Sequence, residues 1–187
     1  MTESPTLASK VQPRMITHVG VTVPNADDAI EWYQSVLGFQ LMIEPQDYTA
    51  GEGYFGKLVA DMLGPHVVSG KIAMMDAGNG VGFEVFEFLD PKPEQRGSDE
   101  NTQFYLQKTG TFHFCVIDPD IEGLARRIAE TGGKQRSAVW EFSPGLGFYA
   151  CYCEDPFGNI VEIYSHSTCH IWSGLAQVNK AAGEHQP

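Results

Sequence analysis

The feature that most constrains the fold of this chain is an internal repeat. Segment 17–24 (THVGVTVP) recurs as segment 112–119 (FHFCVIDP), and the register between the two copies continues beyond them. The residues that match at one offset of 95 positions are His18 with His113, Pro24 with Pro119, Gly38 with Gly133 and Gln40 with Gln135. Because a repeat constrains where distant residues meet, we expect two copies of one structural module.

Each copy predicts a strand, a turn and a helix. Apolar residues alternate with His18 and its neighbours in segment 18–23, which is the pattern of a strand with one apolar face. Segment 26–37 then places apolar residues at helical spacing and ends at Gly38. The second copy repeats this order around His113. Both histidines are therefore predicted on the strand face turned away from the helix.

Strand-rich segments follow each helix, so the predicted unit is βαβββ, used twice. Those segments are 71–75 and 81–89 in the first half, and 137–142, 146–153 and 159–165 in the second. We expect an α+β fold in which two paired βαβββ modules form a curved mixed sheet around a cleft. The predicted divisions are an N-terminal tail (1–14), a first module (15–91) with a lid-like insertion (44–70), a linker (92–110), a second module (111–166) and a C-terminal tail (167–187), with 15–166 forming a single domain.

Composition narrows the class of partner. Acidic residues outnumber basic ones 24 to 12 in 187 residues, and the net charge of −12 would repel a phosphate backbone. No apolar run approaches the roughly 18 residues of a membrane span, and segment 1–14 lacks the features of a secretory signal. We expect a cytoplasmic protein with a small-molecule substrate, no nucleic acid and no membrane, and with its four cysteines reduced.

Two histidines and two carboxylates are candidates for one metal site. Pairing of the modules would bring the equivalent His18 and His113 to one concave surface. Glu162 lies in an otherwise apolar strand, where burial of a lone carboxylate is costly. In the first half, Glu84 and Glu87 must point to opposite strand faces, and periodicity does not choose between them. Such a nitrogen and oxygen donor set suits Zn²⁺, Ni²⁺, Co²⁺, Mn²⁺ or Fe²⁺.

These motifs resemble the vicinal oxygen chelate superfamily, which includes glyoxalase I, methylmalonyl-CoA epimerase, extradiol dioxygenases and bleomycin- or fosfomycin-resistance proteins. The resemblance covers 16–165 and is carried by 17–21, 32–33, 37–39, 112–114 and 155–162. It implies a metal in the cleft held by His18, His113, Glu162 and a first-half carboxylate. Segment 84–87 looks like the family's Glu-Leu-Leu-Glu strand, which favours Glu84, whereas alignment on Pro91 would favour Glu87.

The resemblance also implies a reaction class. A glyoxalase-like lyase or isomerase would act on a small substrate with vicinal oxygens by proton transfer through a metal-bound enediolate, with Glu162 or Glu84 as the base. One alternative is an Fe²⁺-dependent dioxygenase that uses His18, His113 and Glu162 as a facial triad. Another alternative is a protein that binds and sequesters a small molecule. Formation of a homodimer is left open.

Overall fold

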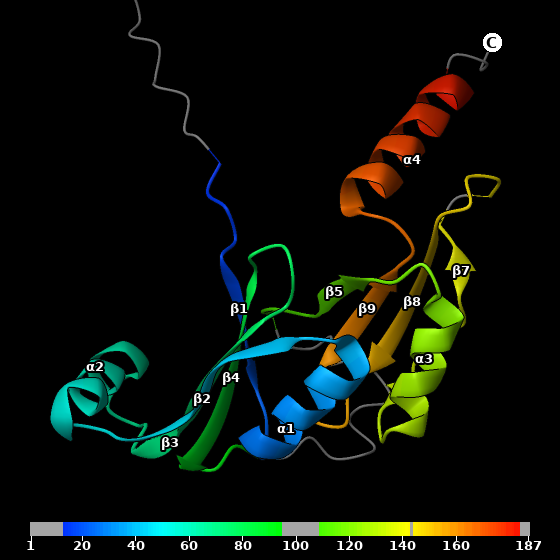
Figure 1. The fold of residues 1–187 in the computed structure, drawn as a ribbon. Coiled ribbons are helices and arrows are strands. Elements are labelled where there is room, and N and C mark those ends of the chain that lie inside the picture. The colour runs from blue at the N-terminus through cyan, green and yellow to red at the C-terminus, as the bar shows by residue number, and fades with distance from the viewer. Residues whose placement is uncertain (1–12, 95–108, 143, 184–187) are drawn as a thin grey trace, which may run out of the picture.

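The structure is a computed structural model that describes residues 13–94, 109–142 and 144–183 (Figure 1). Most of the expected N-terminal tail (1–14) and of the expected linker (92–110) lies outside these ranges.

The first module has the predicted order of elements around a four-stranded sheet. Its elements are β1 (His18–Thr22), α1 (Ala26–Trp32), the π-helical turn η1 (Tyr33–Leu37), β2 (Gln40–Thr49), α2 (Gly53–Leu63), β3 (Ser69–Asp76) and β4 (Gly82–Asp90). The strand order is β1-β4-β3-β2, in which β1 is parallel to β4 and the other pairs are antiparallel. The predicted helix over 26–37 is confirmed as α1 and η1, and it ends where Gly38 adopts a φ of 72°.

The second module repeats this topology. Its elements are β5 (Phe114–Ile117), α3 (Ile121–Glu130), β6 (Lys134–Gln135), β7 (Trp140–Glu141), β8 (Tyr149–Glu154), β9 (Ile160–Tyr164) and α4 (Thr168–Gly183). The strand order is β5-β9-β8-β6, with β7 paired to β8, and β5 is parallel to β9 as β1 is to β4. The α+β class and the double βαβββ unit are therefore confirmed. The strands form two separate sheets within the described residues, because no ladder joins β1 to β5.

One apolar core joins the two modules. It contains residues of α1, η1, β4, α3, β8 and β9 in a single cluster of buried side chains. Phe83 of the first module packs edge-on against Phe114 of the second, with ring centroids 5.0 Å apart. The hydroxyl of Tyr33 donates a 2.6 Å hydrogen bond to Asp155 Oδ2, and the two residues lie in different modules. The helices thus cover one side of each sheet, which leaves the opposite sides for His18 and His113.

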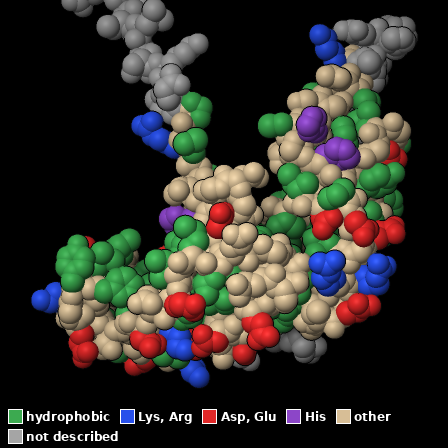
Figure 2. Space-filling model, viewed as in Figure 1, with side chains coloured by type: hydrophobic (Ala, Val, Ile, Leu, Met, Phe, Trp, Pro, Cys, Tyr) green, Lys and Arg blue, Asp and Glu red, His purple; other side chains and the backbone are tan. Residues whose placement is uncertain are grey.

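Residues 168–183 form helix α4 where the sequence predicted a tail. The helix projects beyond the second sheet, and the surface is hollowed between it and the segment that leads into β1 (Figures 1 and 2). The base of α4 is anchored, because Ile171 is fully buried and Gly174 lies close against the ring of Phe148. This anchoring depends on residues outside the repeat, so the periodicity of the modules did not reveal it.

The insertion of the first module contains a helix but does not cover the second module. Residues 53–63 of the insertion form helix α2 (Gly53–Leu63), and residues 44–49 continue strand β2. Figure 1 places α2 at the far end of the first sheet from the second module. Among the described residues, no helix is long and apolar enough to cross a membrane.

Candidate active site

The first-half candidates His18 and Glu84 lie on one face of the first sheet. Strand register pairs His18 with Gly82 and Gly20 with Glu84, so that the two side chains project to the same side. His18 Nε2 lies 3.5 Å from Glu84 Oε2. The pair is open to solvent, with 47% of the His18 side chain exposed.

Glu87 lies on the opposite, helix-facing side of β4. Its side chain is buried, and Oε2 accepts a 2.9 Å hydrogen bond from the backbone N–H of Ala26, the first residue of α1. Helix N-termini carry unpaired N–H groups and a partial positive charge, which a carboxylate satisfies. Glu87 therefore acts at the start of α1, and the structure places Glu84 rather than Glu87 next to His18.

The second-half candidates form a closer and more buried pair. His113 directly precedes β5, and its Nε2 lies 3.0 Å from Glu162 Oε2 on β9. Only 8% of the Glu162 side chain and 29% of the His113 side chain are exposed. The other ring nitrogen, His113 Nδ1, is buried and has no hydrogen-bond partner within the described residues.

Polar side chains on neighbouring strands surround Glu162. Tyr152 of β8 lies directly opposite Glu162 in the ladder, so that the two side chains project from the same strand face. Burial, and then the neighbouring Glu162 carboxylate, raises the pKa of Tyr152. Cys115 of β5 is the other cross-strand neighbour of Glu162, and burial followed by the charge of Glu162 raises the pKa of its thiol to about 12. Glu162 thus interacts with a hydroxyl and a thiol that both stay protonated at neutral pH.

The donor chemistry of the two pairs fits a divalent transition metal. With metal–donor bonds of about 2.1 Å at right angles, two donors lie about 3.0 Å apart, close to the His113 and Glu162 separation. Each pair alone supplies only two ligands. In the part of the chain that the structure describes, no three His, Cys, Asp or Glu side chains gather around one point. The structure therefore brings His18 to Glu84 and His113 to Glu162. We call these two pairs the half-sites, and the structure does not bring them together.

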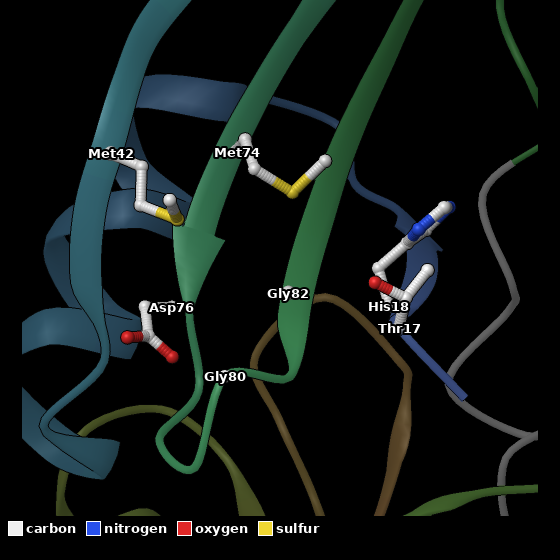
Figure 3. A pocket seen from close by; sticks show the side chains of 7 residues that line it. All are labelled: Thr17, His18, Met42, Met74, Asp76, Gly80 and Gly82. Carbon is white, nitrogen blue, oxygen red and sulfur yellow. The ribbon is translucent and has the colours of Figure 1, made fainter. Parts of the chain in front are cut away.

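Each half-site borders a cavity. A cavity of about 240 Å³ beside His18 is lined by Thr17, Met42, Met74, Asp76, Gly80 and Gly82 (Figure 3). A second cavity of about 770 Å³ lies between residues 19–24, in β1 and the turn after it, and the second module, over 111–114 and 154–160. His113 lines this larger cavity, which is of a size that accommodates a small organic ligand.

Comparison with known proteins settles the family. The family model described as the Glyoxalase/Bleomycin resistance protein/Dioxygenase superfamily matches residues 15–163. The chain belongs to this superfamily. Structural similarity agrees with this assignment at the level of the fold.

Solved structures of the superfamily include two that are informative here. A glyoxalase-family protein from Bacillus cereus is similar with a TM-score of 0.62 and 22% identity, over 84% of this chain and 97% of that chain. Glyoxalase I from Zea mays is similar with a TM-score of 0.53 and 18% identity, over 81% of this chain and 44% of that chain. At such identities the likeness shows the fold alone.

A curated protein with a similar sequence is an epimerase. The 2-epi-5-epi-valiolone epimerase from Actinomyces sp. is 26% identical over 118 residues, which are 63% of this chain and 59% of that protein. The match thus spans about three fifths of the length of the relative. An isomerase-type enzyme is consistent with membership of the superfamily.

Sequence reasoning did not identify the surroundings of Glu162. Tyr152 and Cys115 flank Glu162 because strands β8 and β5 pair with β9 in a particular register. One signal was present in the sequence: Tyr152 alternates with Cys151 and Cys153, which are buried in the core, so its side chain must point to the other face.

Proposed function

We propose that this superfamily member is a metal-dependent, glyoxalase-like lyase or isomerase that moves a proton at a carbon next to the carbonyl of a small substrate with vicinal oxygens. The observation that carries this proposal is the buried carboxylate of Glu162, which lies 3.0 Å from an imidazole nitrogen of His113. His113 in turn lines the cavity of about 770 Å³. A partly desolvated carboxylate beside a candidate metal site is a suitable general base. The epimerase relative supports an isomerisation over other reactions of the superfamily.

The roles follow from chemistry and placement. His18, Glu84, His113 and Glu162 would hold Zn²⁺, Ni²⁺, Co²⁺, Mn²⁺ or Fe²⁺, which when bound supplies a Lewis acid that polarises the substrate carbonyl. Glu162 would accept and return the proton, because its carboxylate is buried and lies 3.0 Å from His113 Nε2. Glu84 is the second candidate base, and it is less buried than Glu162.

The two half-sites must meet for this chemistry. A homodimer offers one way, since a second copy could present its His18 and Glu84 to the His113 and Glu162 of the first. The exposure of His18 is compatible with such an arrangement. The homodimer and the cytoplasmic location remain proposals.

Metal analysis and an oxygen-controlled assay test the proposed function. The purified protein should retain about one transition metal per chain and turn over hemithioacetals or epimerisable hydroxyketones without oxygen. Replacement His113→Ala should abolish metal retention, whereas His66→Ala, at an exposed histidine outside both half-sites, should not. Glu162→Gln should lower turnover strongly even where metal remains, because it removes the base as well as a charged ligand.

Other outcomes identify the alternatives. Activity that appears only with Fe²⁺ and consumes O₂ in proportion to product would replace the proposal with the dioxygenase. Tight binding of a ligand that is recovered unchanged would favour a sequestering protein. Full metal retention in His113→Ala would refute the ligand assignment.

A further inference from the structure

No described protein group forms a hydrogen bond with Nδ1 of His113, which is buried. A ligating imidazole normally donates its second ring N–H to a carboxylate, a carbonyl or water, which fixes the ring and its tautomer. The imidazole contacts Glu162 through Nε2, at 3.0 Å. Packing of neighbouring side chains against the ring is a further means of orienting it toward Glu162.

Two aromatic rings pack against His113: Phe112, which precedes it in the chain, and Tyr152, which lies opposite Glu162. Phe112 lies edge-on to the imidazole with ring centroids 5.2 Å apart, and Tyr152 does so at 5.4 Å. The rings of Phe112 and Tyr152 also contact each other, at 5.8 Å. Edge-to-face contacts at these separations are favourable and directional. The imidazole is therefore held by a pair of rings that are themselves in contact.

Tyr152 also reaches the second member of the pair. It is the cross-strand neighbour of Glu162 in the β8–β9 ladder, and both side chains project from the same strand face. One side chain thus packs against the His113 ring and lies beside Glu162. The ring and the hydroxyl can be removed separately by substitution.

We propose that Phe112 and Tyr152 form an aromatic clamp that positions His113 against Glu162 by packing on the imidazole ring. Both are positioning residues, because they act through the two candidate ligands. The proposal rests on the proposed function only in its consequence for metal binding. The geometry of the clamp itself can be measured on the metal-free protein.

The first measurement is made without metal. Nuclear Overhauser contacts between the His113 ring protons and the Glu162 side chain should be strong in the wild-type protein. They should be lost in Phe112→Leu and Tyr152→Leu and should persist in Tyr152→Phe, which keeps the ring. Persistence of the His113–Glu162 contacts in both leucine variants would overturn the clamp.

The second measurement is titration of the metal-free protein with Co²⁺. Loss of an outer contact of a metal ligand typically weakens metal affinity about 10- to 100-fold. We expect a loss of this size in Phe112→Leu and Tyr152→Leu, with an altered Co²⁺ absorption spectrum, and a smaller loss in Tyr152→Phe. Phe148→Leu is the matched control, because Phe148 packs edge-on against His166 at 5.0 Å, away from the pair.

The two measurements separate the possible failures. A wild-type protein that binds no Co²⁺ but shows the contacts predicted for each variant would refute the proposed function and support the clamp. If the wild-type protein binds Co²⁺ and both leucine variants bind it with the same affinity, the clamp is refuted and the metal assignment stays in place. An equal loss of affinity in Phe148→Leu would show a general effect of aromatic removal, which also contradicts the clamp.

Discussion

Removal of the Tyr33 hydroxyl should weaken the junction between the two modules. Tyr33 of η1 donates a 2.6 Å hydrogen bond to Asp155 Oδ2 in the turn between β8 and β9, and both side chains are buried. Asp155 also accepts hydrogen bonds from the backbone of Phe157 and Asn159 and from the Asn159 side chain. Tyr33→Phe keeps the ring in the core and removes only the donor from the first module.

The expected loss follows from the charge and burial of the acceptor. A hydrogen bond to a charged group contributes roughly 1.5–3 kcal/mol, so Tyr33→Phe should lower the free energy of unfolding by about 2 kcal/mol. For a chain of this length, that corresponds to a fall in Tm of roughly 4–8 °C.

The loss should also depend on pH. Burial raises the pKa of Asp155, and the hydrogen bond from Tyr33 opposes this increase. A raised pKa in the folded state means that proton binding stabilises the fold at low pH, and that this stabilisation is lost as pH rises through the folded pKa. Tyr33→Phe raises the pKa of Asp155 further. Its deficit should therefore be larger at pH 7 than at pH 4, where a larger fraction of the carboxyl is protonated.

Denaturant unfolding at both pH values measures this effect. Tyr54→Phe makes the same chemical change at a residue that is 86% exposed, and it should leave the stability within about 0.5 kcal/mol of wild type. A Tyr33→Phe deficit no larger than that of the control, or one that is equal at pH 4 and pH 7, would refute the reasoning.

Three further predictions concern single side chains. Glu87→Gln should lower stability by about 1 kcal/mol in thermal unfolding, because Glu87 accepts a hydrogen bond from the N–H of Ala26 at the start of α1. Its metal content should stay unchanged, and a loss of metal would instead identify Glu87 as the ligand. Both Cys115 and Cys169 are exposed. At pH 8, iodoacetamide followed by mass spectrometry should nevertheless label Cys169 and leave Cys115 largely unmodified, because the pKa of the Cys115 thiol is raised to about 12. Rapid labelling of Cys115 would contradict this. Gly70→Ala should lower the free energy of unfolding by about 1–3 kcal/mol, because a Cβ at this position would lie 2.3 Å from a backbone oxygen. Unchanged stability in urea unfolding would contradict this and show that β3 moves to make room for the methyl group.

The repeat determined most of the architecture before any tertiary structure was known. Alternation in segment 18–23 placed His18 opposite the core, and the structure confirms it, with Val21 and Val23 buried and His18 exposed. Equal spacing in the two copies predicted the same topology for both modules. Local patterns suffice here, because strand alternation and helix periodicity depend only on neighbouring residues.

Only the tertiary structure decided between Glu84 and Glu87. Apolar residues occupy both faces of β4, so alternation alone left the choice open. The pairing of β4 with β1 sets Glu84 on the side of His18, and the packing of α1 against the sheet places Glu87 at the N-terminus of that helix. Both relations join segments more than 60 residues apart, and no local pattern encodes them.

The surroundings of the candidate base depended on tertiary structure for the same reason. Glu162 was predicted as a buried carboxylate from its apolar neighbours, and the structure buries it. Its contacts with His113 and Tyr152 arise from the order β5-β9-β8, which brings three strands of different sequence position side by side. Sequence periodicity predicts which face a side chain takes, whereas strand pairing decides which other side chains it meets there.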